Sequence, residues 1–293
     1  MINRDDYEEP RCLLKTCELI KDEDEPVQMV PITRIIDKLD NCLNKDDYAS
    51  AERLLLYWEQ EAILFKDLKG HLTICNELIG LYRKIGNPEK VIIYINLCLS
   101  LLNKLELTDS ISAGTTYLNI GTGYKFLKDN KQALIYYQTA EKIYLKVLNQ
   151  NDYNFAGLYN NMGLAEMDLG LYDDGLNDFF KALKILSNNN EQKIDQAITY
   201  LNIANLYELK LGLLDGATFI DKYVNKALSI LNDPNIRHDG YYAFVLEKCA
   251  SAIKYYGYFM DANELLERSK NIYEGIRNSW SILQYFWKKD DSW

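Results

Sequence analysis

Residues suited to catalysis are few and scattered in this sequence. It contains only two histidines, His71 and His238, and neither has a serine or cysteine at the spacing of a nucleophile–base pair. The segment GTG at residues 121–123 begins like a dinucleotide-binding loop, but Phe126 occupies the position of its third glycine and no strand pattern precedes it. The sequence therefore predicts a protein that is not an enzyme, with no catalytic residue and no cofactor.

Three acidic residues are the exception, because they could form a general acid–base pair. Asp168, Glu208 and Glu247 fall on helical faces that the sequence pattern directs inward. Two carboxylates at a fixed separation can hydrolyse a glycosidic bond, and six helix hairpins also form the α/α toroids of some glycosidases. An α/α-toroid-like hydrolase is therefore a third functional alternative, which the regular repeat described below disfavours.

The six cysteines give no metal-binding or redox motif. No two of them are spaced as C-x-x-C, and most lie inside apolar helical patterns. We interpret them as buried, reduced thiols and predict no metal site, with a zinc or redox site as the alternative. The cysteines are Cys12, Cys17, Cys42, Cys75, Cys98 and Cys249.

The most informative polar residue is asparagine, which recurs at regular intervals. Asn119, Asn161 and Asn202 are separated by 42 and 41 residues, although asparagine has a low helix propensity. A side-chain amide offers one acceptor and two donors, so it can pair with both the N–H and the C=O of an extended peptide. Such a series favours peptide binding. The alternative is that each amide bonds a neighbouring helix or loop and stiffens the structure.

The elements that carry these asparagines form an internal repeat. Small or apolar anchor residues recur at intervals of 40, 42, 42, 41 and 46 residues, and further small residues follow the best-defined anchors by 12 and 19 positions. Small residues at fixed offsets allow two antiparallel helices to cross closely, and apolar residues at helical spacing support two amphipathic helices in each unit. The six anchors are Leu39, Ile79, Gly121, Gly163, Ala204 and Ala250.

This pattern resembles the tetratricopeptide repeat (TPR), with units about seven residues longer than the usual 34 or so. It is similar to the long repeats of kinesin light chains and of Rap/PlcR-type peptide-pheromone receptors. The resemblance implies an all-α fold, a right-handed superhelical solenoid of about six TPR-like hairpins with terminal capping helices. The matching residues are Tyr117-x2-Ile120-Gly121-x2-Tyr124, Ala133-x3-Tyr137, Ala140, Tyr159-x2-Met162-Gly163, Gly175-x3-Phe179 and Ala182.

The resemblance also implies where a ligand would bind, because inner-face asparagines of these families hold a peptide in a concave groove. We expect the recurring asparagines to point into such a groove, with further amides and apolar pockets beside them. The predicted peptide-binding residues are Asn76, Asn119, Asn160, Asn161, Asn202, Asn205, Phe126, Leu164, Met167, Leu201 and Leu209.

The two ends differ from the repeats. Residues 1–31 are interpreted as an acidic N-terminal arm or capping helix, residues 32–277 as the solenoid, and residues 278–293 as an aromatic capping segment. The alternatives for the last segment are pairing with a second copy of the chain as a homodimer and binding in a groove. Its aromatic residues are Trp280, Tyr285, Phe286, Trp287 and Trp293.

The net charge and the distribution of apolar residues indicate which classes of partner and which cellular compartment to expect. A net charge of −10 disfavours nucleic acid, and no apolar run is long enough to cross a membrane. No signal-peptide pattern opens the sequence, and the composition favours codons rich in A and T, so we expect a cytoplasmic, bacterial protein. The predicted function is a non-catalytic scaffold for a peptide or protein segment. The alternative is a peptide-sensing regulator of the pheromone-receptor type that lacks a DNA-binding domain.

Overall fold

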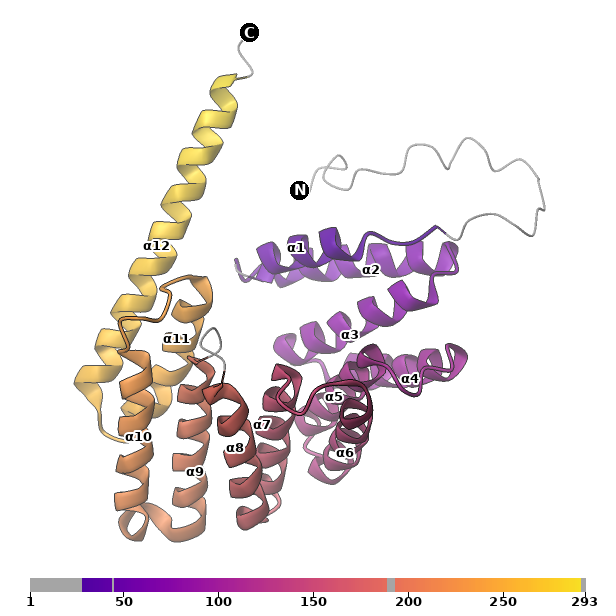
Figure 1. The fold of residues 1–293 in the computed structure, drawn as a ribbon. Helices are drawn as coiled ribbons and strands as arrows, with labels where there is room; N and C mark the ends of the chain where they lie inside the picture. Colours follow the sequence, from indigo (N-terminus) through magenta and orange to yellow (C-terminus); the bar gives the residue numbers. More distant parts are fainter. Residues whose placement is uncertain (1–27, 44, 189–192, 291–293) are drawn as a thin grey trace, which may run out of the picture. The chain divides into compact units, whose positions relative to one another are not determined.

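The computed structural model describes residues 28–43, 45–188 and 193–290, with side chains up to residue 275. In these ranges the chain forms twelve α-helices and no strand, in the order of the six predicted helix pairs (Figure 1). The predicted all-α helical-repeat fold is therefore confirmed. No helix in the described ranges has the length and apolar content needed to cross a bilayer. The chain divides into two compact units, Met1–Lys128 and Asp129–Trp293.

The N-terminal unit contains the first five helices. Each of the first four helices packs against the next one in the chain, and α5 packs against both α3 and α4. A helix therefore contacts its own pair and the next repeat, as in a stack of hairpins. The helices are α1 Ile32–Leu43, α2 Tyr48–Leu64, α3 Leu68–Ile85, α4 Pro88–Lys104 and α5 Ile111–Phe126.

The C-terminal unit contains the other seven helices. Consecutive helices from α6 to α10 pack together, α11 packs on α12, and α9 also contacts α7 and α11. The first helices of successive repeats, α7, α9 and α11, therefore lie side by side. The helices are α6 Asn130–Val147, α7 Tyr153–Asp168, α8 Tyr172–Ser187, α9 Asp195–Asp215, α10 Ala217–Leu231, α11 Gly240–Tyr255 and α12 Phe259–Asp290.

Local sequence signals set the helix ends. Gly86 ends α3 in the left-handed conformation at φ 81°, Asn87 caps α4 by accepting from the Lys90 N–H, and Pro88 follows in the first turn. Glycine, asparagine and proline in this order are typical of a break between two helices. Aspartate or serine caps six helices through a side-chain oxygen that accepts from a backbone N–H: Asp47, Asp67, Ser110, Asp129, Asp152 and Asp239.

The predicted close crossing of small residues is present between α7 and α8. A Cβ atom added at Gly163 would lie 2.8 Å from the Phe179 ring and 3.0 Å from the carbonyl oxygen of Gly175. A Cβ atom added at Gly175 would lie 3.0 Å from the carbonyl oxygen of Gly163. The two glycines therefore allow a backbone approach that any larger residue would prevent.

Two regions depart from the regular repeat. Helix α9 is kinked at Gly212, in the repeat where the sequence has extra residues, and Leu214 in the following turn is 92% exposed. Helix α12 runs to Asp290, but the side chains beyond residue 275 lie outside the described part of the chain. Residues 1–27 of the predicted acidic arm or capping helix lie outside it as well. The capping role of Trp280 and its aromatic neighbours stays a prediction, as does the right-handed superhelical course.

Candidate functional site

In the N-terminal unit, an asparagine–threonine–asparagine trio ties two repeats together. The Asn76 side chain on α3 donates from Nδ2 to the Thr116 hydroxyl on α5 at 2.9 Å. The Asn119 side chain on α5 donates from Nδ2 to Asn76 Oδ1 at 3.2 Å. Because both amides are used within the protein, this trio fits the structural alternative for the asparagines rather than ligand binding.

The C-terminal unit repeats the trio at equivalent positions, but leaves it open. The Asn160 side chain on α7 donates to the Thr199 hydroxyl on α9 at 2.9 Å, which matches the bond from Asn76 to Thr116. The third bond is missing. Asn160 Oδ1 is buried without a hydrogen-bond partner, and the Asn202 side chain makes no hydrogen bond within the described ranges. Amide groups that are paired in one unit are therefore available in the other.

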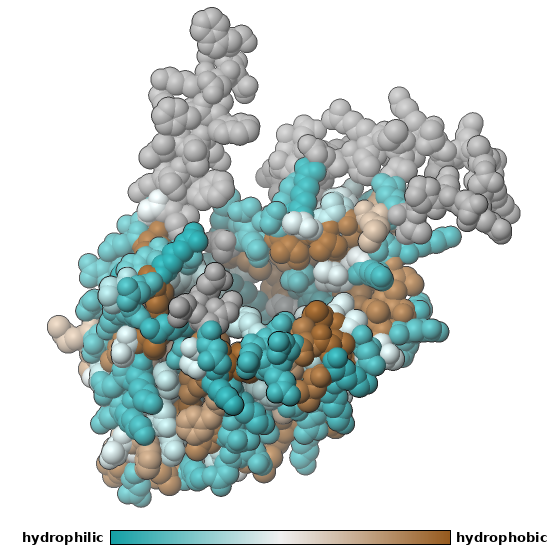
Figure 2. All heavy atoms as spheres, in the orientation of Figure 1, coloured by the Kyte–Doolittle hydropathy of each residue, from teal (hydrophilic) through white to brown (hydrophobic). Residues whose placement is uncertain are grey.

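The two asparagines of this open trio line a hollow of about 190 Å³ between α7, α9 and α11. Four predicted site residues meet there: Asn160, Asn161, Leu164 and Asn202. The Asn161 side chain donates from Nδ2 to the Gly157 carbonyl oxygen on its own helix at 3.0 Å, which leaves its Oδ1 for another partner. Hydrophilic residues predominate on the face of the C-terminal unit that Figure 2 shows.

Three first helices each supply two residues seven positions apart to this hollow. The pairs are Tyr153 and Asn160 on α7, Asp195 and Asn202 on α9, and Tyr241 and Lys248 on α11. Residues seven apart lie on the same face of a helix, two turns from each other. Sequence reasoning found the asparagines but missed the other four residues. The seven-residue spacing to Asn160 and Asn202 could have found Tyr153 and Asp195, and the position two residues before the anchor Ala250 could have found Lys248.

The first residues of the three pairs, Tyr153, Asp195 and Tyr241, are joined by hydrogen bonds. The Tyr153 and Tyr241 hydroxyls both donate to the Asp195 carboxylate, the first at 2.6 Å. Burial, followed by the hydrogen bond to Asp195, raises the pKa of both tyrosines. The phenols therefore stay neutral hydrogen-bond donors at physiological pH.

The second residues of the three pairs are two asparagines and a cation, Asn160, Asn202 and Lys248. Lys248 makes no ion pair with a carboxylate in the described part of the chain, and its Nζ atom lies 6.0 Å from the centre of the Phe244 ring. Lys248 precedes its anchor Ala250 by two residues, as Asn119, Asn161 and Asn202 precede theirs. The hollow thus offers amides and an ammonium group, a combination suited to binding peptide groups and carboxylates.

The structure places the other predicted site residues elsewhere. Met167 and Leu201 are 5% and 6% exposed and belong to the hydrophobic core of the C-terminal unit, which corrects their placement in the groove. Each lies one helical turn from an anchor, so its side chain faces the paired helix. Leu209 is half exposed and Asn205 is partly buried, and neither lines the hollow. Phe126 is partly buried at the end of α5 in the N-terminal unit.

One of the three acidic residues of the hydrolase alternative is bonded to tyrosines, and a separate pair of carboxylates lies inside a hairpin. Glu208 accepts hydrogen bonds from the Tyr255 and Tyr256 hydroxyls. Glu166 on α7 is buried near Asp178 on α8, whose carboxylate is 2.6 Å from Lys181 Nζ. Burial, followed by repulsion from Asp178, raises the pKa of Glu166 to about 8. Sequence reasoning missed this contact, which lies inside a hairpin, away from the hollow.

The described cysteines are free thiols, as the sequence predicted. Cys75, Cys98 and Cys249 are buried and Cys42 is partly buried, whereas Cys12 and Cys17 lie outside the described residues. Burial raises the pKa of Cys249 to about 12. A thiol in such surroundings is a poor nucleophile.

Comparison with known proteins supports the fold. No protein-family model and no curated protein sequence matches the chain. The crystal structure of BtubC (BKLC) from P. vanneervenii is similar with a TM-score of 0.58 and 21% identity, over 70% of this chain and 84% of that one. A kinesin-light-chain-like protein from Podosopora anserina with nearly identical TPR-like repeats gives 0.50 and 13%, over 71% and 96%. The chain therefore has a TPR-like fold, as its sequence predicted.

Proposed function

We propose that the protein is a non-catalytic interaction scaffold, and that the hollow of its C-terminal unit holds the backbone of an extended peptide or partner segment. One observation carries the proposal. Asn160 and Asn202 leave amide groups without partners at positions where Asn76 and Asn119 bond each other. A buried amide oxygen without a hydrogen bond is costly, and a ligand that donates to it removes that cost.

The chemistry of the hollow favours a peptide. An asparagine amide matches the N–H and C=O of an extended backbone, whatever the side chains of that backbone are. Leu164 and Ile198 add apolar contact area, and Lys248 can pair with a carboxylate at the end of the segment or on a side chain. We therefore expect a bound segment that is extended and carries at least one carboxylate near the hollow.

The proposal is tested with linear peptides selected from a random displayed library and measured by isothermal titration calorimetry. Each amide pair contributes about 0.5–1.5 kcal/mol, so Asn202→Ala should weaken binding of a selected peptide by about threefold to tenfold. The matched control is Asn119→Ala, which should leave the affinity unchanged because Asn119 belongs to the closed trio. A library that yields no specific peptide, or peptides that bind Asn202→Ala as tightly as the parent, would contradict the proposal.

A further inference from the structure

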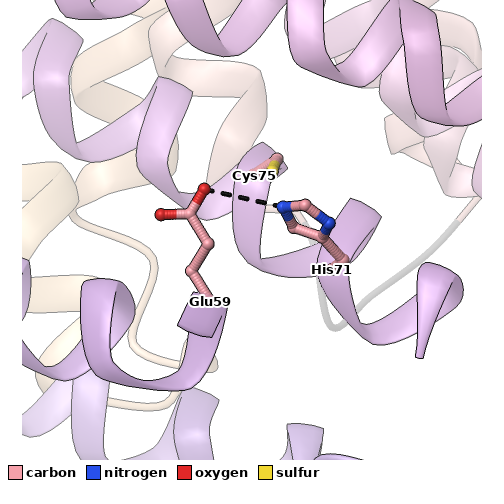
Figure 3. A group of neighbouring side chains, drawn as sticks. All are labelled: Glu59, His71 and Cys75. Carbon is pink, nitrogen blue, oxygen red and sulfur yellow. Dashed lines mark ion pairs between the residues drawn. The ribbon is translucent and has the colours of Figure 1, made fainter. Parts of the chain in front are cut away.

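A second cluster of ligating groups lies in the N-terminal unit. Glu59 comes from α2, and His71 and Cys75 come from α3, where a spacing of four places them on one face (Figure 3). One potential ligand atom from each residue lies within 4.8 Å of those from the other two, and all three side chains are buried. This combination of carboxylate, imidazole and thiol lies outside the hollow and takes no part in the proposed peptide binding.

The contacts inside the cluster leave one polar atom unsatisfied. His71 Nε2 lies 3.5 Å from Glu59 Oε1, and it makes no hydrogen bond although it is buried. Figure 3 shows the imidazole and the carboxylate facing each other, with Cys75 beside the space between them. A buried imidazole nitrogen without a hydrogen bond is unfavourable, and coordination to a cation would satisfy it.

We propose that Glu59, His71 and Cys75 bind one Zn²⁺ ion. Zinc in proteins takes sulfur, nitrogen and oxygen ligands at about 2.0–2.3 Å, so the ligands of a tetrahedral site are about 3.3–3.8 Å apart. The nitrogen and oxygen of His71 and Glu59 already have this separation, at 3.5 Å. The Cys75 sulfur lies within 4.8 Å of both atoms, so the proposed site requires its side chain to move toward them. Binding replaces the thiol proton of Cys75 with the metal and releases that proton to solvent.

A fourth residue fixes the orientation of the carboxylate. The Tyr94 hydroxyl on α4 donates to Glu59 Oε2 at 2.9 Å, which leaves Oε1 directed toward His71. Hydrogen bonds of this kind hold a metal ligand in its binding geometry. Tyr94 is therefore a positioning residue for the metal site. The site joins α2 and α3, which belong to neighbouring repeats, so zinc would strengthen the first two repeats.

The test adds Co²⁺ to the full chain and records the absorption spectrum, followed by displacement with Zn²⁺. One equivalent of Co²⁺ should give the near-ultraviolet band of a cobalt thiolate, and Zn²⁺ should abolish that band and raise the melting temperature. Cys75→Ser and His71→Gln should each lose the band and the thermal shift. Cys249→Ala is the matched control, because it removes a buried thiol of the other unit, and it should retain both.

A further variant keeps the test decisive if the ligand substitutions impair folding. Tyr94→Phe retains all three ligands, and it should give the same cobalt band with an affinity about 10–100-fold lower. An unchanged affinity in Tyr94→Phe would overturn the role of Tyr94 as a positioning residue, and loss of the cobalt band in Glu59→Gln tests the carboxylate ligand itself. Absence of the band in the parent, or a band that persists in folded Cys75→Ser, would show that the cluster is only a buried contact.

Discussion

The closed and open trios predict different stability effects for two equivalent asparagines. Asn119→Ala removes the 3.2 Å hydrogen bond to Asn76 Oδ1, whereas Asn202→Ala removes no hydrogen bond of the described chain. One hydrogen bond contributes about 0.5–1.5 kcal/mol to the free energy of unfolding. Both substitutions replace asparagine with alanine inside a helix, which gains about 0.5 kcal/mol in each variant, so this gain cancels in the comparison.

Asn119→Ala should therefore be less stable than Asn202→Ala by about 0.5–1.5 kcal/mol, and Asn202→Ala should equal or slightly exceed the parent. Urea denaturation followed by far-ultraviolet circular dichroism measures both values. Two double-mutant cycles complete the test, one combining Asn76→Ala with Asn119→Ala and the other combining Asn160→Ala with Asn202→Ala. Only the pair Asn76 and Asn119 should show a coupling energy. Equal free energies for the two single variants would refute the distinction between a closed and an open trio.

Two further substitutions test the packing of the hairpin α7–α8. Gly163→Leu should destabilise the protein by at least about 1–3 kcal/mol in thermal or urea unfolding, because even a Cβ atom would lie 2.8 Å from Phe179. A variant as stable as the parent would refute the close crossing of α7 and α8 at Gly163. Glu166 has its pKa raised to about 8, so the folded state retains a proton that the unfolded state loses above about pH 4.5. The parent should thus lose about 1–3 kcal/mol of stability relative to Glu166→Gln as the pH rises from 5 to 8, and parallel pH profiles would exclude the effect.

The repeat could be predicted from sequence because its packing is local and periodic. Gly163 and Gly175 stand 12 residues apart in the chain, and their closeness follows from a helix hairpin of that length. Gly86, Asn87 and Pro88 fix a helix break through their own backbone preferences. Such signals act over a few residues, so no knowledge of distant packing was needed to interpret them.

The site was predicted less completely because it depends on distances between repeats. Asn119 and Asn202 hold the same position in their repeats, yet only Asn119 lies within hydrogen-bond reach of the preceding repeat's asparagine. Whether two asparagines of neighbouring repeats lie close enough to bond depends on the placement of their helices, which residue types alone do not encode. Asp195 could have been predicted from its seven-residue spacing to Asn202, and Lys248 from its position two residues before the anchor Ala250. The burial of Met167 depends on the packed core.

The proposed function requires that the amides of the open trio bind the peptide. The most direct measurement is NMR of the full chain with ¹⁵N-labelled asparagine, titrated with a library-selected peptide. Single Asn→Ala variants assign the side-chain NH₂ signals of Asn160, Asn202, Asn76 and Asn119. The signals of Asn160 and Asn202 should shift in proportion to bound peptide, while those of Asn76 and Asn119 should not move. Saturation with peptide that leaves the Asn160 and Asn202 signals unchanged would contradict the proposed function.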